Sequence, residues 1–313
     1  CGNGPLNLQV ASELVKEGVT VVAVVEIARP HRWCNLSALL KSFIRSPALM
    51  LKGLVYIAKL RFARVPMLYD HVLVDAQGSD CVESARVVAI NPNGETIRGT
   101  EKKFDVDTVC VGYGFTPNTE ITKLLRCSHD YKREIDSLVV ARQANGATSC
   151  PGVFSVGDSG EVLGSQFALA QGTLAGASVA RNLKKGNDDP REIKLAKRNT
   201  ASHLEFQRAL WTLFSSPKTE NHLFSRGDVI ICRCEDITSF KVMNAIKAGA
   251  TDVASVKKMT RVGMGRCQGR YCGSSVVKLL EYHEKKIPDQ FSWFAPQSPV
   301  KPLPVGSIAQ VKT

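Results

Sequence analysis

The sequence predicts an α/β fold with parallel strands, followed by a small helical domain that contains four cysteines. Three observations support this fold class. First, the chain begins with a glycine turn, a helix and a β-branched strand. Second, residues 109–182 contain a further glycine-bearing strand and a helix rich in small residues. Third, two close cysteine pairs lie after residue 230. We therefore expect an α/β region and then a separate helical domain.

The composition is that of a globular protein large enough for two or three domains. The chain has 313 residues, of which 44% are apolar, so each domain can bury its own core. The formal charge is +12, from 41 basic and 29 acidic residues, but there is no nucleic-acid motif, and we expect no nucleic-acid partner. We also expect no transmembrane segment, because the most apolar stretch, residues 39–60, contains four lysines and arginines.

The cysteines are distributed unevenly along the chain. Six of the ten are single, and four lie in two close pairs. This pattern indicates one thiolate site in a reducing compartment such as the cytoplasm, rather than the disulfide framework of a secreted protein.

The first segment predicts a turn, helix and strand of a nucleotide-binding unit whose first strand is missing. We expect Gly2 to form the tight turn and Gly4 to let the backbone approach a pyrophosphate at the N-terminus of the helix. A strand over residues 19–25 ends at Glu26, whose carboxylate can accept hydrogen bonds from an adenosine ribose. Asn7 replaces the third glycine of the pattern, so an ordinary strand–helix turn remains an alternative, and ATP fits nearly as well as NAD.

A basic region follows between Glu26 and Asp70. It contains eight lysines and arginines and no acidic residue, with apolar residues at roughly helical spacing. We expect two or three basic amphipathic helices within residues 29–64. These helices could lie on their own domain with a solvated basic face, or make a peripheral contact with a membrane or a partner subunit. Short alternating segments after residue 65 then predict strands and a hairpin.

The next region, residues 104–185, predicts two further strands and a helix. A buried strand over residues 109–111 leads into the turn that contains Gly112 and Gly114. A second strand, VFSVGD, ends at Gly157 and Asp158.

A helix rich in small residues is expected after this strand, from about residue 166 to residue 182. Asp158 can accept hydrogen bonds from sugar-type hydroxyl groups, and the helix N-terminus can face a phosphate. An aspartate that only caps a turn is the alternative.

The segment GYGFTPN, followed by VFSVGD and the small-residue helix, resembles the superfamily of two-dinucleotide-binding flavoproteins that includes the disulfide reductases. The resemblance implies a Rossmann-like FAD domain interrupted by an inserted nucleotide domain. It places Gly157 and Asp158 at FAD and Gly2, Gly4 and Glu26 in the inserted domain, which covers residues 1–103, and it adds Gly112 and Gly114 to the cofactor-binding positions. The N-terminal G-x-G-x-x-G of the family is absent, so we expect a partial FAD domain and weak or no FAD retention by this chain alone.

Three segments complete the chain. Residues 186–224 predict a helical connector, residues 225–287 a small domain with the paired cysteines, and residues 288–313 a tail whose five prolines oppose regular structure. The tail is expected to be extended and to lie on a surface.

The paired cysteines are Cys232, Cys234, Cys267 and Cys272. Four thiolates in one small domain need a cation or a cationic cluster between them. Zinc knuckles use C-x(2–4)-C, which makes C-R-C unusually short, whereas a 2Fe-2S cluster needs two thiolates for each of its two irons. Zinc and free thiols remain the alternatives.

The segment around the second pair supports an anionic cluster. Residues 257–270 contain five basic residues and no acid, and the glycines around Cys267 and Cys272 can let backbone N–H groups approach the sulfur atoms. The spacing, with a helix–turn–helix segment between the pairs, resembles the BFD-like 2Fe-2S domain. The C-x4-C pair is similar to that of the α-type subunits of heteromeric amino-acid and opine dehydrogenases.

This second resemblance implies a function. It implies an FAD- and 2Fe-2S-containing electron-transfer subunit that relays electrons from the flavin of a catalytic partner subunit to an acceptor. No catalytic acid, base or nucleophile is expected in this chain. The alternatives are an NAD(P)H-dependent flavin and iron–sulfur reductase, and a non-enzymatic iron–sulfur module with a vestigial nucleotide domain.

Overall fold

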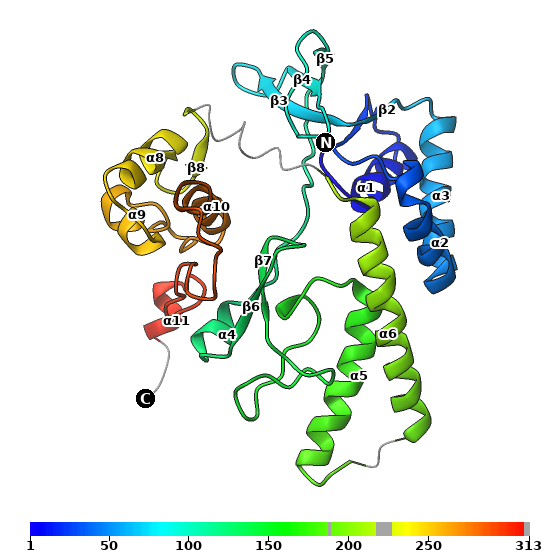
Figure 1. Cartoon of the computed structure of the whole chain (residues 1–313), viewed down its shortest axis with the longest axis vertical. Coiled ribbons are helices and arrows are strands. Elements are labelled where there is room, and N and C mark those ends of the chain that lie inside the picture. Colours follow the sequence, from blue (N-terminus) through cyan, green and yellow to red (C-terminus); the bar gives the residue numbers. More distant parts are fainter. Residues whose placement is uncertain (187–188, 217–226, 310–313) are drawn as a thin grey trace. The chain divides into compact units, whose positions relative to one another are not determined.

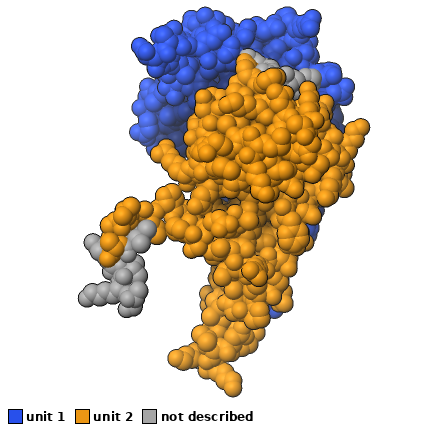
Figure 2. All heavy atoms as spheres, turned by 90° about the vertical axis from the view of Figure 1, so that its left-hand side faces the viewer, with its two compact units in different colours: residues 1–115, 197–219 blue, residues 116–196, 220–313 orange. Residues whose placement is uncertain are grey.

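The structure is a computed structural model that describes residues 1–186, 189–216 and 227–309. The chain forms two compact units (Figure 2). Unit 1 contains residues 1–115 and 197–219, and unit 2 contains residues 116–196 and 220–313. Both units combine helices with short sheets. The predicted α/β fold class is confirmed, while the finer domain boundaries stay predictions.

Unit 1 begins with a helix and a parallel strand pair. Helix α1 (Pro5–Lys16) has proline at its first position, where the missing N–H costs no hydrogen bond. Strand β1 (Val24–Glu26) pairs in parallel with β2 (Met67–Tyr69), and Figure 1 shows α1 and β2 at the right. The core between these elements contains Leu8, Ala11, Val24, Leu60 and Val65. Glu26 therefore lies at the carboxyl end of a parallel strand, the edge at which nucleotides bind in open α/β sheets.

Basic helices form the insertion between β1 and β2, as the sequence predicts. They are η1 (Trp33–Asn35), α2 (Leu36–Arg45) and α3 (Pro47–Phe62). In unit 1, α2 packs against the later part of α6 (Pro190–Leu213) through Ala38, Ala209 and Leu213. Arg45 also forms an ion pair with Glu205 on α6. The helices thus lie on their own unit, but several large apolar side chains on them face solvent: Trp33, Leu36, Leu40, Ile44, Leu51, Leu54, Val55 and Phe62.

An antiparallel sheet completes unit 1. Strand β4 (Ser84–Ala89) lies between β3 (His71–Gln77) and β5 (Lys102–Asp105). The predicted turn at residues 91–94 is present, with Asn91 Oδ1 accepting hydrogen bonds from the N–H groups of Asn93 and Glu95.

Unit 2 starts with the region that precedes the small-residue helix. It contains α4 (Glu120–Leu124), the antiparallel pair β6 (His129–Lys132) and β7 (Ser137–Val140), and the short helix η2 (Gly157–Ser159). Helix α5 (Ser165–Asn182) matches the predicted small-residue helix closely. Its buried residues include Phe167, Ala170 and Leu174.

The C-terminal part of unit 2 is the predicted small helical domain. The hairpin of β8 (Ile230–Cys232) and β9 (Ile237–Thr238) leads to α8 (Ser239–Lys247), α9 (Val253–Thr260) and α10 (Gly273–Glu284). Their core consists of buried aliphatic residues that include Val242, Val256, Val262 and Val276. The predicted helical break at Gly249 is present between α8 and α9.

Several predicted strands are shorter or more exposed than expected. Residues 19–23 are not a strand, and Val153–Asp158 contributes a single bridge at Phe154 before η2. The segment Val109–Val111 is extended but not buried, because among the described residues it pairs only with the Cys1–Gly2 segment and Val111 is 63% exposed. The tail also differs from the prediction: a short helix, α11 (Val305–Ala309), follows its last proline.

Candidate functional site

The glycine turn of unit 1 is held by close backbone contacts. The N–H of Gly2 donates to Val25 O at 2.9 Å, and the N–H of Asn3 donates to Gly112 O at 2.9 Å. A Cβ atom on Gly2 would lie 2.0 Å from Gly112 O. Gly2 therefore does not form the tight turn that the sequence predicts. It lies in extended backbone between β1 and the Gly112 segment, where no side chain fits.

Gly4 and Glu26 form the candidate nucleotide site. Gly4 precedes α1 with φ 123°, and no atom lies within 4 Å of the Cβ position it lacks. Its N–H donates to Glu26 Oε1. Glu26 is 2% exposed, and its other oxygen, Oε2, is buried without a hydrogen-bond partner among the described residues. The open space at the Gly4 Cβ position leaves room for a nucleotide group at the N-terminus of α1, next to the residue whose N–H bonds to Glu26.

The charge of Glu26 depends on its surroundings. Burial raises the pKa of its carboxyl group from 4.5 to about 7, although hydrogen bonds from the Gly4 N–H and the Asn7 side chain oppose this increase. Asn7, at the position of the third glycine, also donates to Gly112 O at 3.3 Å. Sequence reasoning treated Asn7 only as a departure from the glycine pattern. In the structure Asn7, on α1, contacts Gly112 and acts on Glu26.

Gly112 and Gly114 lie in unit 1 with this site. A Cβ atom on Gly112 would lie 2.6 Å from the Asn7 side chain, so glycine is needed there. Gly114 has φ 117° and open space around its Cβ position. The structure thus brings together four of the predicted cofactor-binding residues, Gly2, Gly4, Glu26 and Gly112, and Gly114 follows two residues after Gly112.

The other two predicted cofactor-binding residues, Gly157 and Asp158, lie on η2 in unit 2. Gly157 has φ 59° and would place a Cβ atom 3.2 Å from Ala168 Cβ, so η2 packs closely against α5. The backbone oxygen of Asp158 accepts a hydrogen bond from the Asn118 N–H at 3.0 Å, while its carboxylate is exposed. Helix α5 has no side-chain cap at its N-terminus. This chemistry fits the hydroxyl and phosphate groups of a flavin nucleotide.

The four paired cysteines lie in the small helical domain, where they act on one another electrostatically. Cys232 contributes to the raised pKa of Cys272, and Cys234 contributes to the lowered pKa of Cys267. Cys232 and Cys272 are each 1% exposed, whereas Cys234 is exposed and Cys267 is half-buried. Cys267 also contributes to the raised pKa of Cys272.

The two sides of this arrangement differ electrostatically. Burial, together with the nearby Cys232, raises the pKa of Cys272 to about 12. Burial also acts to raise the pKa of Cys267, but N–H groups from Tyr271, Gly269 and Arg270 and the Cys234 thiol together lower it below its ordinary value. Backbone N–H groups of the loop thus act to stabilise negative charge at Cys267.

The number and type of donor groups in this domain fit a 2Fe-2S cluster. Within residues 1–186, 189–216 and 227–309, no group of three or more His, Cys, Asp or Glu side chains is arranged to hold a metal ion, so the assignment of the four cysteines as ligands stays a prediction. Four thiolates are the donor set that a 2Fe-2S cluster requires, with two thiolates on each iron. A tetrahedral zinc site would need all four sulfur atoms around one centre.

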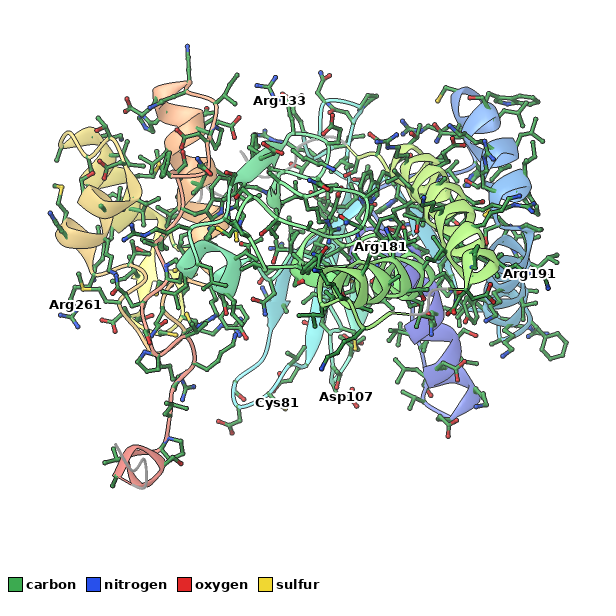
Figure 3. The ribbon with its side chains drawn as sticks, turned by 90° about the horizontal axis from the view of Figure 1, so that it is seen from below. Cys81, Asp107, Arg133, Arg181, Arg191 and Arg261 are labelled. Carbon is green, nitrogen blue, oxygen red and sulfur yellow. The ribbon has the colours of Figure 1, made fainter. Side chains whose placement is uncertain are left out.

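Close packing surrounds the second cysteine pair. A Cβ atom on Gly265 would lie 2.2 Å from Cys234 Cβ, so glycine is needed for Cys234 to reach its place. Glu235, next to Cys234, forms an ion pair at 3.0 Å with Arg261, which Figure 3 labels. Gly263, Gly269 and Gly273 instead face the ring of Phe294 in the tail. Sequence reasoning missed this aromatic residue, and its only local signal was the FSWF segment after Pro288.

Two protein-family models match the chain. Residues 64–182 match the pyridine nucleotide-disulphide oxidoreductase model, and residues 230–282 match the BFD-like [2Fe-2S] binding domain. The chain joins an oxidoreductase domain of this type to a BFD-like [2Fe-2S] domain. The two domain types support a 2Fe-2S cluster and a flavin as cofactors of this oxidoreductase, as predicted.

Curated relatives cover nearly the whole chain. Hydrogen cyanide synthase subunit HcnB of Pseudomonas protegens is 30% identical over 98% of this chain and 64% of the relative. An opine oxidase subunit of Agrobacterium tumefaciens is 27% identical over 99% of this chain and 60% of the relative. The chain thus spans less than two thirds of the length of these relatives. The predicted resemblance to this group of oxidoreductase subunits is confirmed.

A solved structure supports the fold. The crystal structure of L-proline dehydrogenase from P. horikoshii aligns with a TM-score of 0.61 and 19% sequence identity, covering 83% of this chain and 48% of that chain. Among the described residues, no helix has the length and apolar character needed to cross a membrane.

Proposed function

We propose that this chain is the electron-transfer subunit of a heteromeric dehydrogenase of the amino-acid or opine type. In this proposal a flavin-containing partner subunit oxidises the substrate, and the present chain accepts the electrons and passes them to an acceptor. The observation that carries the proposal is the match of residues 230–282, which contain Cys232, Cys234, Cys267 and Cys272, to the BFD-like [2Fe-2S] binding domain. The relatives support it because their names describe them as subunits of a synthase and an oxidase.

We propose a specific ligand arrangement for the cluster. Cys232 and Cys272 hold the buried iron, and Cys234 and Cys267 hold the iron nearer the surface. A 2Fe-2S cluster, when bound, takes up and releases single electrons. The protein contributes the N–H groups around Cys267, which stabilise negative charge on sulfur, and the buried aliphatic core, which limits water on the Cys232 side.

The nucleotide sites have separate proposed roles. Gly157, Asp158 and the N-terminus of α5 would bind part of FAD. Gly4 and Glu26 would bind an adenine nucleotide, NAD or ATP, through the ribose. An acid at this position disfavours NADP, because the carboxylate would repel a 2′-phosphate.

The test is anaerobic purification of the chain together with its co-expressed partner. We expect iron and acid-labile sulfide at a ratio near one, and visible absorption that dithionite bleaches. Cys234→Ser should lose most of this signal. Cys81→Ser is the matched control, because Cys81 is an exposed cysteine on the β3–β4 loop (Figure 3) and should leave the signal intact. Zinc without sulfide in the parent protein would contradict the proposal.

The basic helices suggest a further contact. We propose that η1, α2 and α3 of unit 1 make a peripheral contact with an anionic membrane surface. Trp33 and Phe62 are 92% and 93% exposed, and Lys52, Lys59 and Arg61 have no ion pair within the described part of the chain. Exposed aromatic and aliphatic side chains beside unpaired cations are typical of helices that lie in the membrane interface.

A further inference from the structure

The tail after α10 packs directly on the loop that carries the second cysteine pair. We call residues 288–304 the tail strap and residues 263–273 the cluster loop. In the tail strap, the ring of Phe294 is the nearest neighbour of three glycines in the cluster loop. Cβ atoms on Gly263, Gly269 and Gly273 would lie 2.8, 2.3 and 3.4 Å from this ring. Cys267 and Cys272 lie within the same loop, between the first and last of these glycines.

The three glycines form a socket for the Phe294 ring, because glycine has no side chain to occupy the space that the ring fills. Gly263 and Gly269 have φ values of 78° and 82°, in the left-handed region that favours glycine. Phe294 and Trp293 also pack against the buried core of the small domain. Lys257 Nζ lies 5.8 Å from the centre of the Phe294 ring. The ring is therefore enclosed by the loop, by the core and by a cation.

Polar contacts hold the tail strap on both sides of Phe294. On the N-terminal side, the Gln290 side chain accepts a hydrogen bond from the His129 N–H at 3.0 Å, and the Trp293 ring lies 5.8 Å from that of Tyr131. On the C-terminal side, Gln268 Nε2 donates to Pro299 O at 3.4 Å.

One carboxylate joins the tail strap and the cluster loop to α4. Glu120 Oε2 lies 2.9 Å from Lys301 Nζ, and Glu120 Oε1 forms an ion pair with Arg270, which lies between Cys267 and Cys272. Arg270 and Glu120 are each about 20% exposed at the side chain, so both are largely removed from water. The same side chains thus fix the strap, the loop and the region that precedes the proposed flavin site.

We propose that the tail strap is a positioning element for the cluster loop, with Phe294 as its anchor. The ring fills the glycine socket, excludes water from that side of Cys267 and Cys272, and restricts opening of the loop. The effect on a bound cluster rests on the proposed function, whereas the seating of Phe294 does not. Phe294 contacts the loop that supplies ligands and is a positioning residue, because it contributes no ligand itself.

The first test measures loss of the cluster from the full chain. Iron release to a colourless chelator is followed by the decrease in visible absorption under anaerobic conditions. We expect Phe294→Ala to lose its cluster at least about tenfold faster than the parent, because the loop opens more often when the socket is empty. Phe291→Ala is the matched control, since Phe291 lies in the same strap but is 79% exposed, and it should change the rate less than about twofold. Phe294→Leu should fall between them.

The second test does not need a cluster. A photocrosslinking phenylalanine analogue at position 294 should give crosslinked peptides from residues 263–273, and the same group at position 291 should not. Crosslinks absent from the loop would overturn the proposal, as would equal release rates for Phe294→Ala and Phe291→Ala. Loop crosslinks in a chain that never assembles iron and sulfide would leave the seating intact and contradict the proposed function instead.

Discussion

At the scale of single residues, the burial of Glu26 lowers the stability of the fold and leaves one carboxylate oxygen for a ligand to contact. Its carboxyl group is buried and has one oxygen without a partner among the described residues. A buried carboxylate oxygen that lacks a partner is costly, and we propose that a bound nucleotide supplies the missing donor.

The first prediction concerns pH and Glu26. Because burial raises its pKa from 4.5 to about 7, the folded chain keeps a proton that the unfolded chain releases between these pH values. Stability should therefore fall as pH rises through this window and level off above about pH 7. Glu26→Gln should remove this fall and stabilise unit 1 at pH 8 by up to about 3 kcal/mol.

Thermal unfolding at pH 4.5, 6 and 8 checks this prediction. Glu17→Gln is the control, because Glu17 is an exposed glutamate at the end of α1. A melting temperature whose pH dependence is the same in Glu26→Gln and the parent would contradict it. An adenine nucleotide should bind more tightly above pH 7, where the carboxylate can accept hydroxyl donors.

The second prediction concerns Gly265. Its Cβ position lies 2.2 Å from Cys234 Cβ, so Gly265→Ala should displace a ligand and weaken cluster retention about tenfold or more. Gly53→Ala in α3 is the control, because no atom lies within 4 Å of that Cβ position, and alanine favours helix. Iron content after chelator competition measures both, and full retention in Gly265→Ala would refute the proposed place of Cys234.

At the scale of elements, the basic helices of unit 1 carry their own prediction. We expect the chain to cosediment with vesicles that contain anionic phospholipid and to be released by high salt. Trp33→Ser combined with Phe62→Ser should weaken binding at least about fivefold, because two exposed aromatic anchors are lost. Phe291→Ser removes an exposed aromatic side chain from unit 2 and should leave vesicle binding unchanged. Absence of vesicle binding at low salt would rule out the membrane contact. If the double variant instead fails to copurify with the partner subunit, the exposed side chains of these helices bind that subunit.

Local patterns predicted the helices better than the strands. Helix α5, the break at Gly249 and the end of β1 at Glu26 all follow from spacing, glycine and side-chain type within a short window. The strands expected at residues 19–23 and 109–111 depend on the neighbours available for pairing, which a local window does not contain. The same is true of Phe294, because its contacts come from a loop more than twenty residues earlier in the chain.

In the candidate sites, too, features set by local sequence could be predicted, and features that depend on distant segments could not. The roles proposed from the sequence for the four cysteines, Glu26 and the nearby glycines stay predictions. The sequence did not predict the contact between Asn7 and Gly112, or the seating of Phe294 against the cluster loop. These features depend on how separate segments meet, so spacing alone could not reveal them.

At the scale of the whole molecule, the direction of electron flow separates the proposed function from its main rival. A reductase would take electrons from NADH, whereas a dehydrogenase subunit receives them from its partner. We expect NADH to leave the flavin of the purified complex oxidised, and an amino-acid or opine substrate to bleach it. Visible absorption under anaerobic conditions decides between them, and rapid bleaching by NADH would favour the reductase.

The four cysteines come from two ends of the small domain, the β8 hairpin and the loop before α10, and this has a consequence for the protein in the cell. A cluster bound by all four cysteines would link the first hairpin of the domain covalently to the loop before its last helix. Chains made during iron starvation would lack this link, and proteases would cut their small domain more readily than that of chains with a bound cluster. The abundance of the enzyme would then follow the iron supply without any change in transcription.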